Sequence, residues 1–530
     1  MIPQCPRVAP AALFILTLMV ASLFAVIGVD PHHDGVMLKQ ATDVAGGRIL
    51  FREVFTQQGA LPVLIQALSM VLFGRYLIVV RLSAAVFYAL TSLALWHAWA
   101  KILPRWAATA SCIIWLLMAP YYTRLFMPWP SVYALLFQAL SLCLLLASLD
   151  RAHRGWLFAA GATSCMAFWC RQPVGILLGL AILVVLVILS AARMTPRGGW
   201  LKNTGVFMCG WLAVSSAFLA WLSLSGALRD WWLQTFVAAH AFAMKYGGGG
   251  TVYAVMRALL TRNGSWRPDG ALLWLLLPLA CVLLFVVACY EIGVRRKTTP
   301  ANARVLAVSA IGIASWFQYY PLPCARHVYW GATPMVGLYL YLLIVLWRGE
   351  NASGIRASCT SPKTLCALLV TLCMTAPLAA CIVSNIRAGI LTLQRAATEC
   401  VTVEYPPVLR RMRVPRAAAA VYADAARTIN GYLDSHPSTQ FITLGQDALY
   451  LVFTERTPKV HPMYVNWRWI NRSVYPDYRR TMTGYIHEHK PLILSYRPKL
   501  EGYYTLAIFA GGKAFLLAPV DNEEPRSLSE

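Results

Sequence analysis

Apolar runs about as long as a lipid bilayer is thick recur throughout the first 385 residues of this chain. A helix needs roughly 20 mainly apolar residues to cross the hydrocarbon core, so each run is a candidate transmembrane helix. The candidates are residues 10–29, 78–100, 106–120, 131–149, 156–170, 174–192, 204–225, 271–290, 305–320, 328–347 and 364–385. The sequence therefore predicts an α-helical polytopic membrane protein with about 11 transmembrane helices.

The last part of the chain, residues 386–530, has a different character. Charged residues become frequent there, and runs of membrane length stop. The elements predicted from hydrophobic pattern are helices at 416–436 and 447–456, strands at 440–445 and 490–496, and a hairpin within 503–519. We expect residues 1–385 to form the membrane domain and residues 386–530 to form a small soluble α/β domain.

Positive charge dominates the short connections between the apolar runs. The formal net charge of the chain is +24, and several short connections carry Lys and Arg on the same predicted side as Arg7. Cytoplasmic loops of membrane proteins show this excess, so the N-terminus is predicted to be cytoplasmic. An odd number of spans then places the C-terminal domain on the outer side. Membrane lipids with anionic headgroups are the expected partners of these cations, and nucleic acid is not.

The segment "DPHHDG", residues 30–35, directly follows the first apolar run. Four of the nine acidic residues within the first 385 positions lie between Asp30 and Glu53. Three interpretations are open: a solvated loop, a metal site of Asp and His side chains, or a general base that deprotonates a hydroxyl acceptor. A carboxylate at a membrane rim costs desolvation energy unless it is paired or used. We therefore favour the general base.

Amphipathic stretches follow this loop and are interrupted at Gly59 and Gly74. They are unsuited to crossing a bilayer, so we expect them to lie in the membrane interface as helices. Arg48 and Arg52 in this region either pair with Glu53 or bind a phosphate group.

An apolar helix followed by "DPHHDG", "GGRILFREVFTQQGAL" and "ALSMVLFGRYLIVVRLSAA" resembles the GT-C membrane glycosyltransferases. Within these it is similar to the protein O-mannosyltransferase-like and lipopolysaccharide-core-modifying group, over about residues 10–105. The resemblance implies a polyprenyl-phosphate sugar donor and an essential acid in the first outer loop. Asp34 matches that acid best, Asp30 is the alternative base, and Glu53 falls on a second acidic position. Gly35 replaces the usual second acid, which leaves a divalent metal open; no other cofactor is expected.

A phosphate-bearing donor predicts cations on the outer face. Arg326 and His327 stand just before a predicted helix in "PLPCARHVYWGATP", where a guanidinium fork and a helix N-terminus favour an anion. The alternative is an interfacial aromatic belt with a snorkelling Arg. Arg171 and Arg52 are further candidates for binding the donor phosphate. The candidate substrate contacts are His32, His33, Glu53, Gln57, Arg124 and Lys245.

We therefore expect an inverting-type glycosyltransferase of the bacterial inner (plasma) membrane. It would move a sugar from a polyprenyl-phosphate donor to a lipid, glycan or protein acceptor on the periplasmic side. The competing interpretation is a transporter or flippase for lipid-linked glycans, which predicts internal repeats and charges near the membrane midplane. The sequence shows no such repeat, and its acidic cluster lies at the outer rim.

Overall fold

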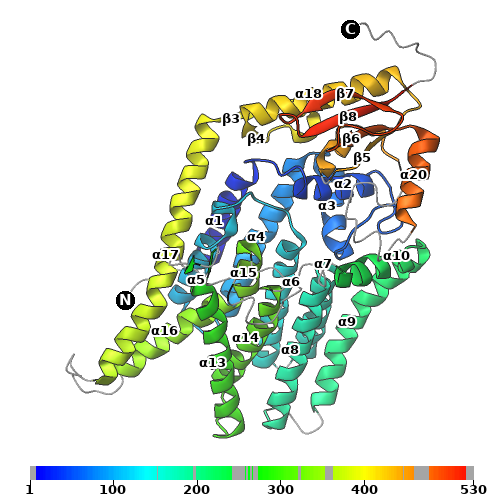
Figure 1. The fold of residues 1–530 in the computed structure, drawn as a ribbon. Coiled ribbons are helices and arrows are strands. Elements are labelled where there is room, and N and C mark those ends of the chain that lie inside the picture. The colour runs from blue at the N-terminus through cyan, green and yellow to red at the C-terminus, as the bar shows by residue number, and fades with distance from the viewer. Residues whose placement is uncertain are drawn as a thin grey trace.

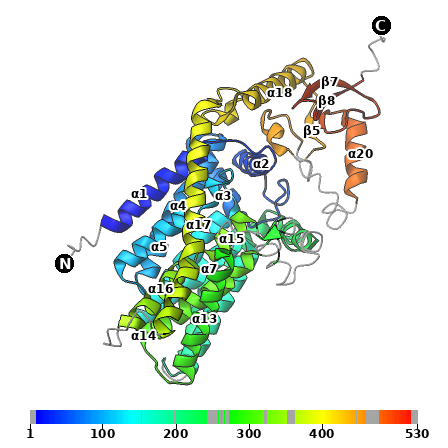
Figure 2. The ribbon, with the colours of Figure 1, turned by 60° about the vertical axis from the view of Figure 1, so that its left-hand side comes forward.

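A bundle of long helices carries a smaller α/β unit at one end (Figures 1 and 2). The computed structural model describes residues 8–151, 153–194, 199–241, 257, 261–262, 265–266, 272–319, 324–351, 362–445, 447–458 and 477–520.

Each predicted span coincides with an apolar helix or, for 328–347, with a bent pair of helices. The helices of the bundle are α1 (Val8–Ala25), α4 (Leu77–Trp99), α5 (Arg105–Leu117), α6 (Pro130–Arg151), α7 (Arg154–Cys170), α8 (Gln172–Ala191), α9 (Gly199–Leu224), α13 (Leu273–Gly293), α14 (Pro300–Trp316), α15 (Ala325–Ala332), α16 (Met335–Asn351) and α17 (Pro362–Thr398). Within the described residues, six helices are long and apolar enough to cross a membrane, or up to seven if the bent pair is one span.

The bent pair consists of α15 and α16, which meet at 61°. Thr333 and Pro334 separate the two helices. Proline has no amide hydrogen and its ring clashes with the preceding turn, so a straight helix does not continue through this point. The bend gives α15 a direction of its own at the end of the bundle.

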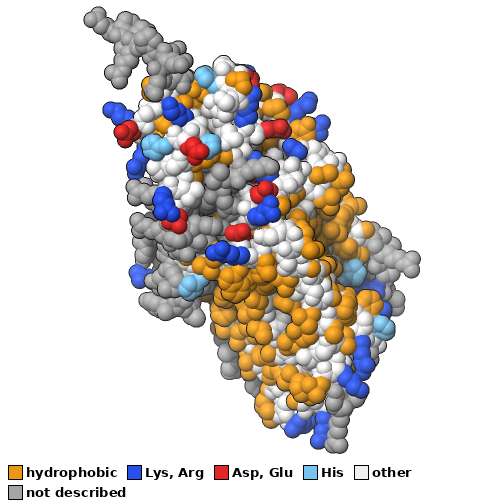
Figure 3. Space-filling model, turned by 90° about the vertical axis from the view of Figure 1, so that its right-hand side faces the viewer, with side chains coloured by type: hydrophobic (Ala, Val, Ile, Leu, Met, Phe, Trp, Pro, Cys, Tyr) orange, Lys and Arg blue, Asp and Glu red, His pale blue; other side chains and the backbone are white. Residues whose placement is uncertain are grey.

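The surface of the bundle agrees with its apolar sequence. Figure 3 shows apolar side chains over the flank of the bundle, with charged side chains gathered on the C-terminal unit and at the opposite end. Exposed large apolar residues on two of these helices are Leu180, Val184 and Val187 on α8, and Leu279, Leu283 and Val286 on α13. A band of this kind is suited to contact with lipid chains.

Two helices lie between the bundle and the C-terminal unit, as the sequence predicts for the first outer loop. They are α2 (His33–Ala45) and α3 (Ala60–Phe73). The connection between them contains Phe51, which is fully buried and has a φ of 67°, a conformation that non-glycine residues rarely adopt. Gln234 fixes this connection, because its side chain accepts from the Thr56 amide at 3.0 Å and donates to the Phe51 carbonyl at 2.7 Å.

The C-terminal unit is a small α/β domain, as predicted. Its elements are β3 (Cys400–Thr402), β4 (Arg413–Pro415), α18 (Arg416–Ser435), β5 (Phe441–Thr443), η5 (Ala448–Val452), α20 (Tyr478–His489), β6 (Leu492–Ser495), β7 (Tyr503–Phe509) and β8 (Ala514–Pro519). The larger sheet has the order β5-β6-β8-β7, in which only the β5–β6 pair is parallel. The predicted hairpin within 503–519 is the β7–β8 pair.

The predicted helix at 447–456 is wrong in extent and type. Only the 3-10 helix η5 forms there. Four consecutive side chains of η5, from Ala448 to Leu451, are buried. A segment that is buried on all sides has no polar face. Its hydrophobic pattern therefore lacks the alternation of apolar and polar faces by which an amphipathic α-helix is recognised.

The C-terminal unit shares a hydrophobic core with the outer loop. Leu38 of α2 and Val80 of α4 belong to the same buried cluster as Leu409, Ile429 and Leu449. The long helix α17 continues past residue 385, where the sequence predicts the domain boundary, as far as Thr398. The boundary at 385/386 stays a prediction, and the shared core joins the two parts physically.

Helices α7 and α9 cross closely because a glycine stands on each helix at the contact. A Cβ on Gly161 would lie 2.0 Å from the Phe207 carbonyl oxygen, and one on Gly210 would lie 2.0 Å from that of Phe158. Small residues of this kind let backbones approach within a membrane, where lipid offers no hydrophobic driving force between helices.

Replacing Gly210 by Ala is expected to destabilise the protein by about 1–3 kcal/mol, because the new methyl group forces the two helices apart. Gly205→Ala on the same helix is the matched control, since a Cβ there meets nothing within 4 Å. Thermal unfolding of purified protein in detergent, followed by tryptophan fluorescence, measures both. Equal stability of the two variants would contradict the close crossing.

Candidate active site

The "DPHHDG" segment forms a compact turn that leads into α2. Asp30 Oδ1 accepts the backbone N–H groups of His32 at 3.0 Å and His33 at 2.9 Å. Asp30 Oδ2 lies 3.1 Å from His33 Nδ1. An ionised carboxylate only accepts hydrogen bonds, so this arrangement assigns the proton to Nδ1 and leaves Nε2 as the basic nitrogen of a neutral ring.

These hydrogen bonds control the charge of Asp30. Partial burial raises its pKa, but the side-chain and backbone hydrogen bonds from His33, the electrostatic influence of that residue and the His32 amide together lower the pKa from 3.8 to about 2. The side chain keeps 26% of its surface exposed. Asp30 is therefore an ionised and accessible carboxylate at neutral pH.

Asp34, the first choice for the base from sequence, has a different environment. It is fully buried and forms a two-pronged ion pair with Arg81 of α4, with oxygen–nitrogen distances of 2.5 and 3.2 Å. Its Oδ2 also accepts the Asp30 amide at 2.8 Å. Arg81 in turn donates to the carbonyl oxygens of Ala25 and Ile27 at 3.0 and 3.1 Å. Asp34 thus anchors the turn to the bundle.

The segment 124–131, which runs from the end of η1 (Pro120–Tyr122) into the first turn of α6, contacts two of the predicted phosphate-binding cations. The Leu125 carbonyl accepts from Arg326 Nη2 at 3.2 Å, and Leu125 also packs against Gly28 just before Asp30. The Trp129 ring lies 5.4 Å from the His33 ring. Ser131 Oγ accepts from Arg171 Nη1 at 2.6 Å.

Arg326 and Arg124 are coupled near the partly exposed Asp30 carboxylate, and Arg171 contacts the same 124–131 segment. Arg171 also donates to Gln318 Oε1 at 3.2 Å, and Arg124 is exposed in the same connection. Electrostatic coupling links Arg326 to both Asp30 and Arg124. Within the described part of the chain, neither Arg171 nor Arg326 forms an ion pair with a carboxylate. This surplus of positive charge is complementary to a phosphate group.

Other predicted site residues lie nearby or elsewhere. The His32 ring packs edge-on against His33 at 4.7 Å, and the His327 ring lies 5.7 Å from the Trp330 ring. Lys245 lies outside the described residues.

Three predicted residues belong to the α2–α3 connection. Arg52 is exposed and donates to the Ser225 carbonyl at 3.1 Å, so it faces the end of α9. Glu53 accepts the Ile49 amide at 2.8 Å within its own turn. Gln57 is partly buried, and its side-chain nitrogen has no partner among the described residues.

A second charged cluster, which the sequence did not predict, lies farther along α2. Lys39 Nζ donates to Asp43 at 2.5 Å and to Thr457 Oγ1 at 3.0 Å. Arg48 lies 3.3 Å from Asp43 and donates to the Thr457 carbonyl at 2.9 Å. Burial lowers the pKa of Lys39, and the Asp43 carboxylate counteracts this effect. The i, i+4 spacing of Lys39 and Asp43 was the available signal.

The donor set near Asp30 does not fit a divalent metal ion. Both Asp30 oxygens accept N–H donors, and both Asp34 oxygens accept from Arg81. No group of three or more His, Cys, Asp or Glu side chains suited to a metal occurs among the described residues.

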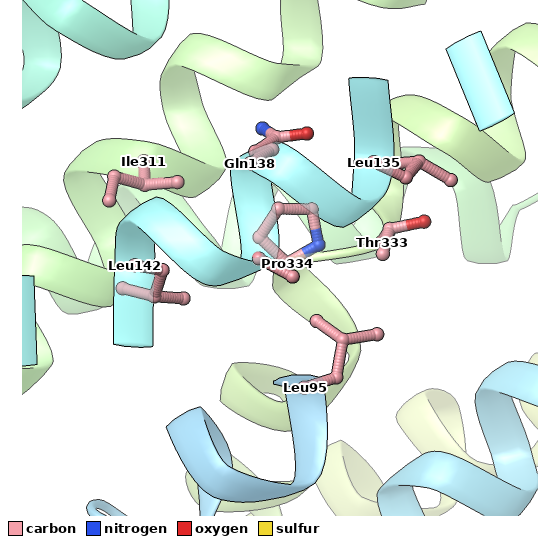
Figure 4. A pocket seen from close by; sticks show the side chains of 8 residues that line it. Leu95, Leu135, Gln138, Leu142, Ile311, Thr333 and Pro334 are labelled. Atoms are coloured by element: carbon pink, nitrogen blue, oxygen red, sulfur yellow. The ribbon is translucent and has the colours of Figure 1, made fainter. Parts of the chain in front are cut away.

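An internal hollow lies within the helix bundle and does not include the Asp30 cluster. Its empty volume is about 200 Å³, and it is too narrow to admit a water molecule. Figure 4 shows its lining around the α15–α16 bend. The lining residues are Leu95, Leu135, Gln138, Ala139, Leu142, Ile311, Thr333 and Pro334. We interpret it as a packing space next to the bend.

Comparison with known proteins agrees with this architecture. A family model described as dolichyl-phosphate-mannose-protein mannosyltransferase matches residues 58–221. No curated protein matches the chain.

Among solved structures, ArnT from Cupriavidus metallidurans bound to undecaprenyl phosphate is similar with a TM-score of 0.58 and 14% identity, covering 98% of this chain and 99% of that one. ArnT in the apo state has a TM-score of 0.56 and 15% identity, covering 96% and 98% of the two chains. The Archaeoglobus fulgidus oligosaccharyltransferase AglB, in complex with an inhibitory peptide and a dolichol-phosphate, has a TM-score of 0.52 and 11% identity, covering 98% of this chain and 75% of that one.

The fold is therefore the GT-C fold. Together with the family match over residues 58–221, this fold supports a membrane glycosyltransferase of the GT-C superfamily. This confirms the resemblance inferred from sequence.

Replacing Arg81 by Met is expected to destabilise the protein by about 3–5 kcal/mol, because it leaves the Asp34 carboxylate buried without its counter-charge. The double variant Asp34→Asn/Arg81→Met removes both charges and is expected to recover a large part of that loss. Thermal unfolding in detergent measures both variants. A single variant as stable as wild type would show that the pair does not anchor the loop.

Proposed function

We propose that this glycosyltransferase moves a sugar from a polyprenyl-phosphate donor to a hydroxyl group of a lipid, glycan or protein acceptor. The observation that carries the proposal is the pairing of one ionised, accessible carboxylate, Asp30, with the uncompensated cations Arg326, Arg171 and Arg124. A sugar phosphate needs these two features on either side of its anomeric carbon. The family match and the undecaprenyl phosphate bound to the similar ArnT structure support the donor class.

Transfer in this site is a single displacement. The acceptor oxygen forms a bond to the anomeric carbon while the bond from that carbon to the phosphate oxygen breaks. The acceptor proton passes to the Asp30–His33 pair, and polyprenyl phosphate leaves with its negative charge. One attack from the face opposite the phosphate inverts the anomeric centre.

Asp30 and His33 share the proton-accepting role. A carboxylate with a pKa of about 2 is itself a weak base. It can nevertheless hold a neighbouring imidazole in one tautomer and stabilise the imidazolium that forms. His33 directs Nδ1 to Asp30 and keeps 39% of its side chain exposed. We therefore place the base at this pair and give Asp34 an anchoring role.

The cations serve the leaving group. Charge develops on the phosphate oxygens as the bond breaks, and fixed guanidinium groups stabilise that charge without reorganisation. Arg326 and Arg171 are held by neutral acceptors, so their charge remains available to the donor. His327 follows Arg326 on α15 and completes the predicted pair of donor contacts.

We place the reaction on the periplasmic side of the bacterial inner membrane. The N-terminus is then cytoplasmic and the C-terminal unit extracytoplasmic, as the positive charge of the short connections indicates. A polyprenyl chain would lie along the apolar flank of the bundle (Figure 3).

A flippase for lipid-linked glycans is the alternative. It would also bind the phosphate, but it would form no new glycosidic bond. Donor turnover that requires Asp30 distinguishes the enzyme from the transporter.

Replacing Asp30 by Asn is expected to lower the transfer rate roughly 100-fold or more, because the imidazole loses the charge that orients it. Labelled undecaprenyl-phosphate-linked mannose is the donor probe, in proteoliposomes with a cell-envelope extract as acceptor. Binding of undecaprenyl phosphate, followed by tryptophan fluorescence, should stay within threefold of wild type.

Arg326→Gln is the contrasting variant and is expected to weaken the binding of undecaprenyl phosphate instead. Full transfer by Asp30→Asn would overturn the assignment of the base.

The pH dependence tests the charge state of Asp30. Because the pKa of Asp30 is lowered to about 2, its charged form persists down to that pH and is lost only below it. Protonation of Asp30 should therefore not reduce kcat/KM above about pH 4. The pH profiles of kcat/KM for the wild type and for Asp30→Asn measure this. A loss of wild-type activity above about pH 4 that is absent from Asp30→Asn would contradict the expectation.

A further inference from the structure

The segment that leads to Asp30 is paired with a strand of the C-terminal unit. The Gly28 amide donates to the Arg413 carbonyl, and the Arg413 amide donates to the Val26 carbonyl, both at 2.7 Å. Ile27 and Arg413 thereby form a parallel bridge. Residues 26–28, which lead into the "DPHHDG" turn, thus pair with β4 along its edge.

The other side of the turn is held by η5. The Leu449 amide donates to the Pro31 carbonyl at 3.1 Å. Both contacts are made by the backbone, so they fix the path of the chain on either side of Asp30. The backbone on the two sides of Asp30 is thus bonded to β4 and to η5 of the C-terminal unit, and Arg81 of the bundle binds Asp34 of the same turn.

Gly35 allows this close seating. A Cβ at Gly35 would lie 2.2 Å from the Leu449 amide nitrogen and 2.8 Å from the Ala448 carbonyl carbon. Both atoms belong to the backbone, which cannot move aside as a flexible side chain does. The first turn of α2 therefore touches η5 directly, and any side chain at position 35 has to separate them.

A third contact lies one turn farther along α2. Lys39 and Arg48 bind Thr457 through its hydroxyl and its carbonyl at 3.0 and 2.9 Å. Between these polar contacts, Leu38 packs into the same hydrophobic cluster as Leu449. The attachment combines backbone pairing, apolar packing and buried ionic hydrogen bonds.

We propose that the C-terminal unit is a positioning element of the active site, in which β4 and η5 hold the Asp30 turn in the geometry required for transfer. This inference deepens the proposed function and rests on the assignment of Asp30. The unit would act through the turn without itself contacting the reacting atoms. Separation of η5 from α2 would then release the turn and slow transfer without removing the phosphate-binding cations.

Gly35→Ala tests the inference, with Gly431→Ala of α18 as the matched control. Both are glycines in helices, but a Cβ at Gly431 meets nothing within 4 Å. Hydrogen–deuterium exchange of the full-length protein in lipid nanodiscs reports the turn directly, because the amides of Gly28, Asp30, His32, His33 and Asp34 are bonded within it or to β4. We expect exchange in this segment to rise at least tenfold in Gly35→Ala and to stay unchanged in Gly431→Ala.

Activity provides the second measurement. With undecaprenyl-phosphate-linked mannose as donor, kcat of Gly35→Ala should fall at least tenfold while the donor KM changes less than threefold. Should Gly35→Ala fail to fold, Thr457→Val removes only the hydroxyl bound to Lys39 and should raise the same exchange at least threefold.

Unchanged exchange in the folded variants overturns the inference. Normal transfer by Asp30→Asn would instead overturn the proposed base, and the exchange experiment would still decide whether the unit holds the turn.

Discussion

The ion pair between Asp34 and Arg81 is the interaction on which the candidate site depends. Arg81 lies in the first turns of α4 and donates to the carbonyls of Ala25, the last residue of α1, and Ile27 as well as to the Asp34 carboxylate. One guanidinium therefore joins the end of a transmembrane helix, the turn that follows it and the start of α2. Because both side chains are fully buried, removal of either leaves an uncompensated polar group in a low-dielectric surrounding.

This pairing divides two nearby carboxylates into different roles. The negative charge of Asp34 is compensated by Arg81 in an ion pair. Hydrogen bonds from its own turn keep Asp30 ionised, and its side chain remains accessible. The same division, in which environment sets the role of each acid, is common in enzymes that use two carboxylates. In the proposed mechanism it directs the proton-accepting function to the Asp30–His33 pair.

The sequence predicted the architecture well, because the features that determine it are local. Apolar length located the helices of the bundle, amphipathic length located α2 and α3, and short apolar runs located β5, β6 and the β7–β8 hairpin, whereas β3 and β4 were not predicted. The error at 447–456 arose because this segment is buried by neighbouring elements that are distant in sequence. The periodicity of the local sequence carries no information about such burial.

The choice between Asp30 and Asp34 was beyond sequence reasoning for a related reason. Arg81 lies 47 positions from Asp34, and nothing in the spacing shows which acid it meets. Arg171 and Arg326 were proposed separately as phosphate ligands. Only the fold shows that both of them, and His33, contact the segment 124–131.

Gly35 shows how the soluble unit and the acidic turn constrain each other. From sequence it was a departure from the expected second acid, with no evident cause. In the structure a side chain at that position would collide with the backbone of η5. At this position, two parts of the chain that are more than 400 residues apart in sequence are in direct contact, which leaves no space for a side chain.

Helix α17 gives this contact a mechanical setting. Its 37 residues correspond to a length of about 55 Å, nearly twice the thickness of a bilayer core. Strand β3 begins two residues after the helix ends, so no flexible linker separates the membrane span from the C-terminal unit. We therefore expect a change in the tilt of α17 to move the C-terminal unit and, with it, the Asp30 turn. Because the tilt of a long span depends on bilayer thickness, the thickness of the surrounding lipid would then affect the geometry of the site.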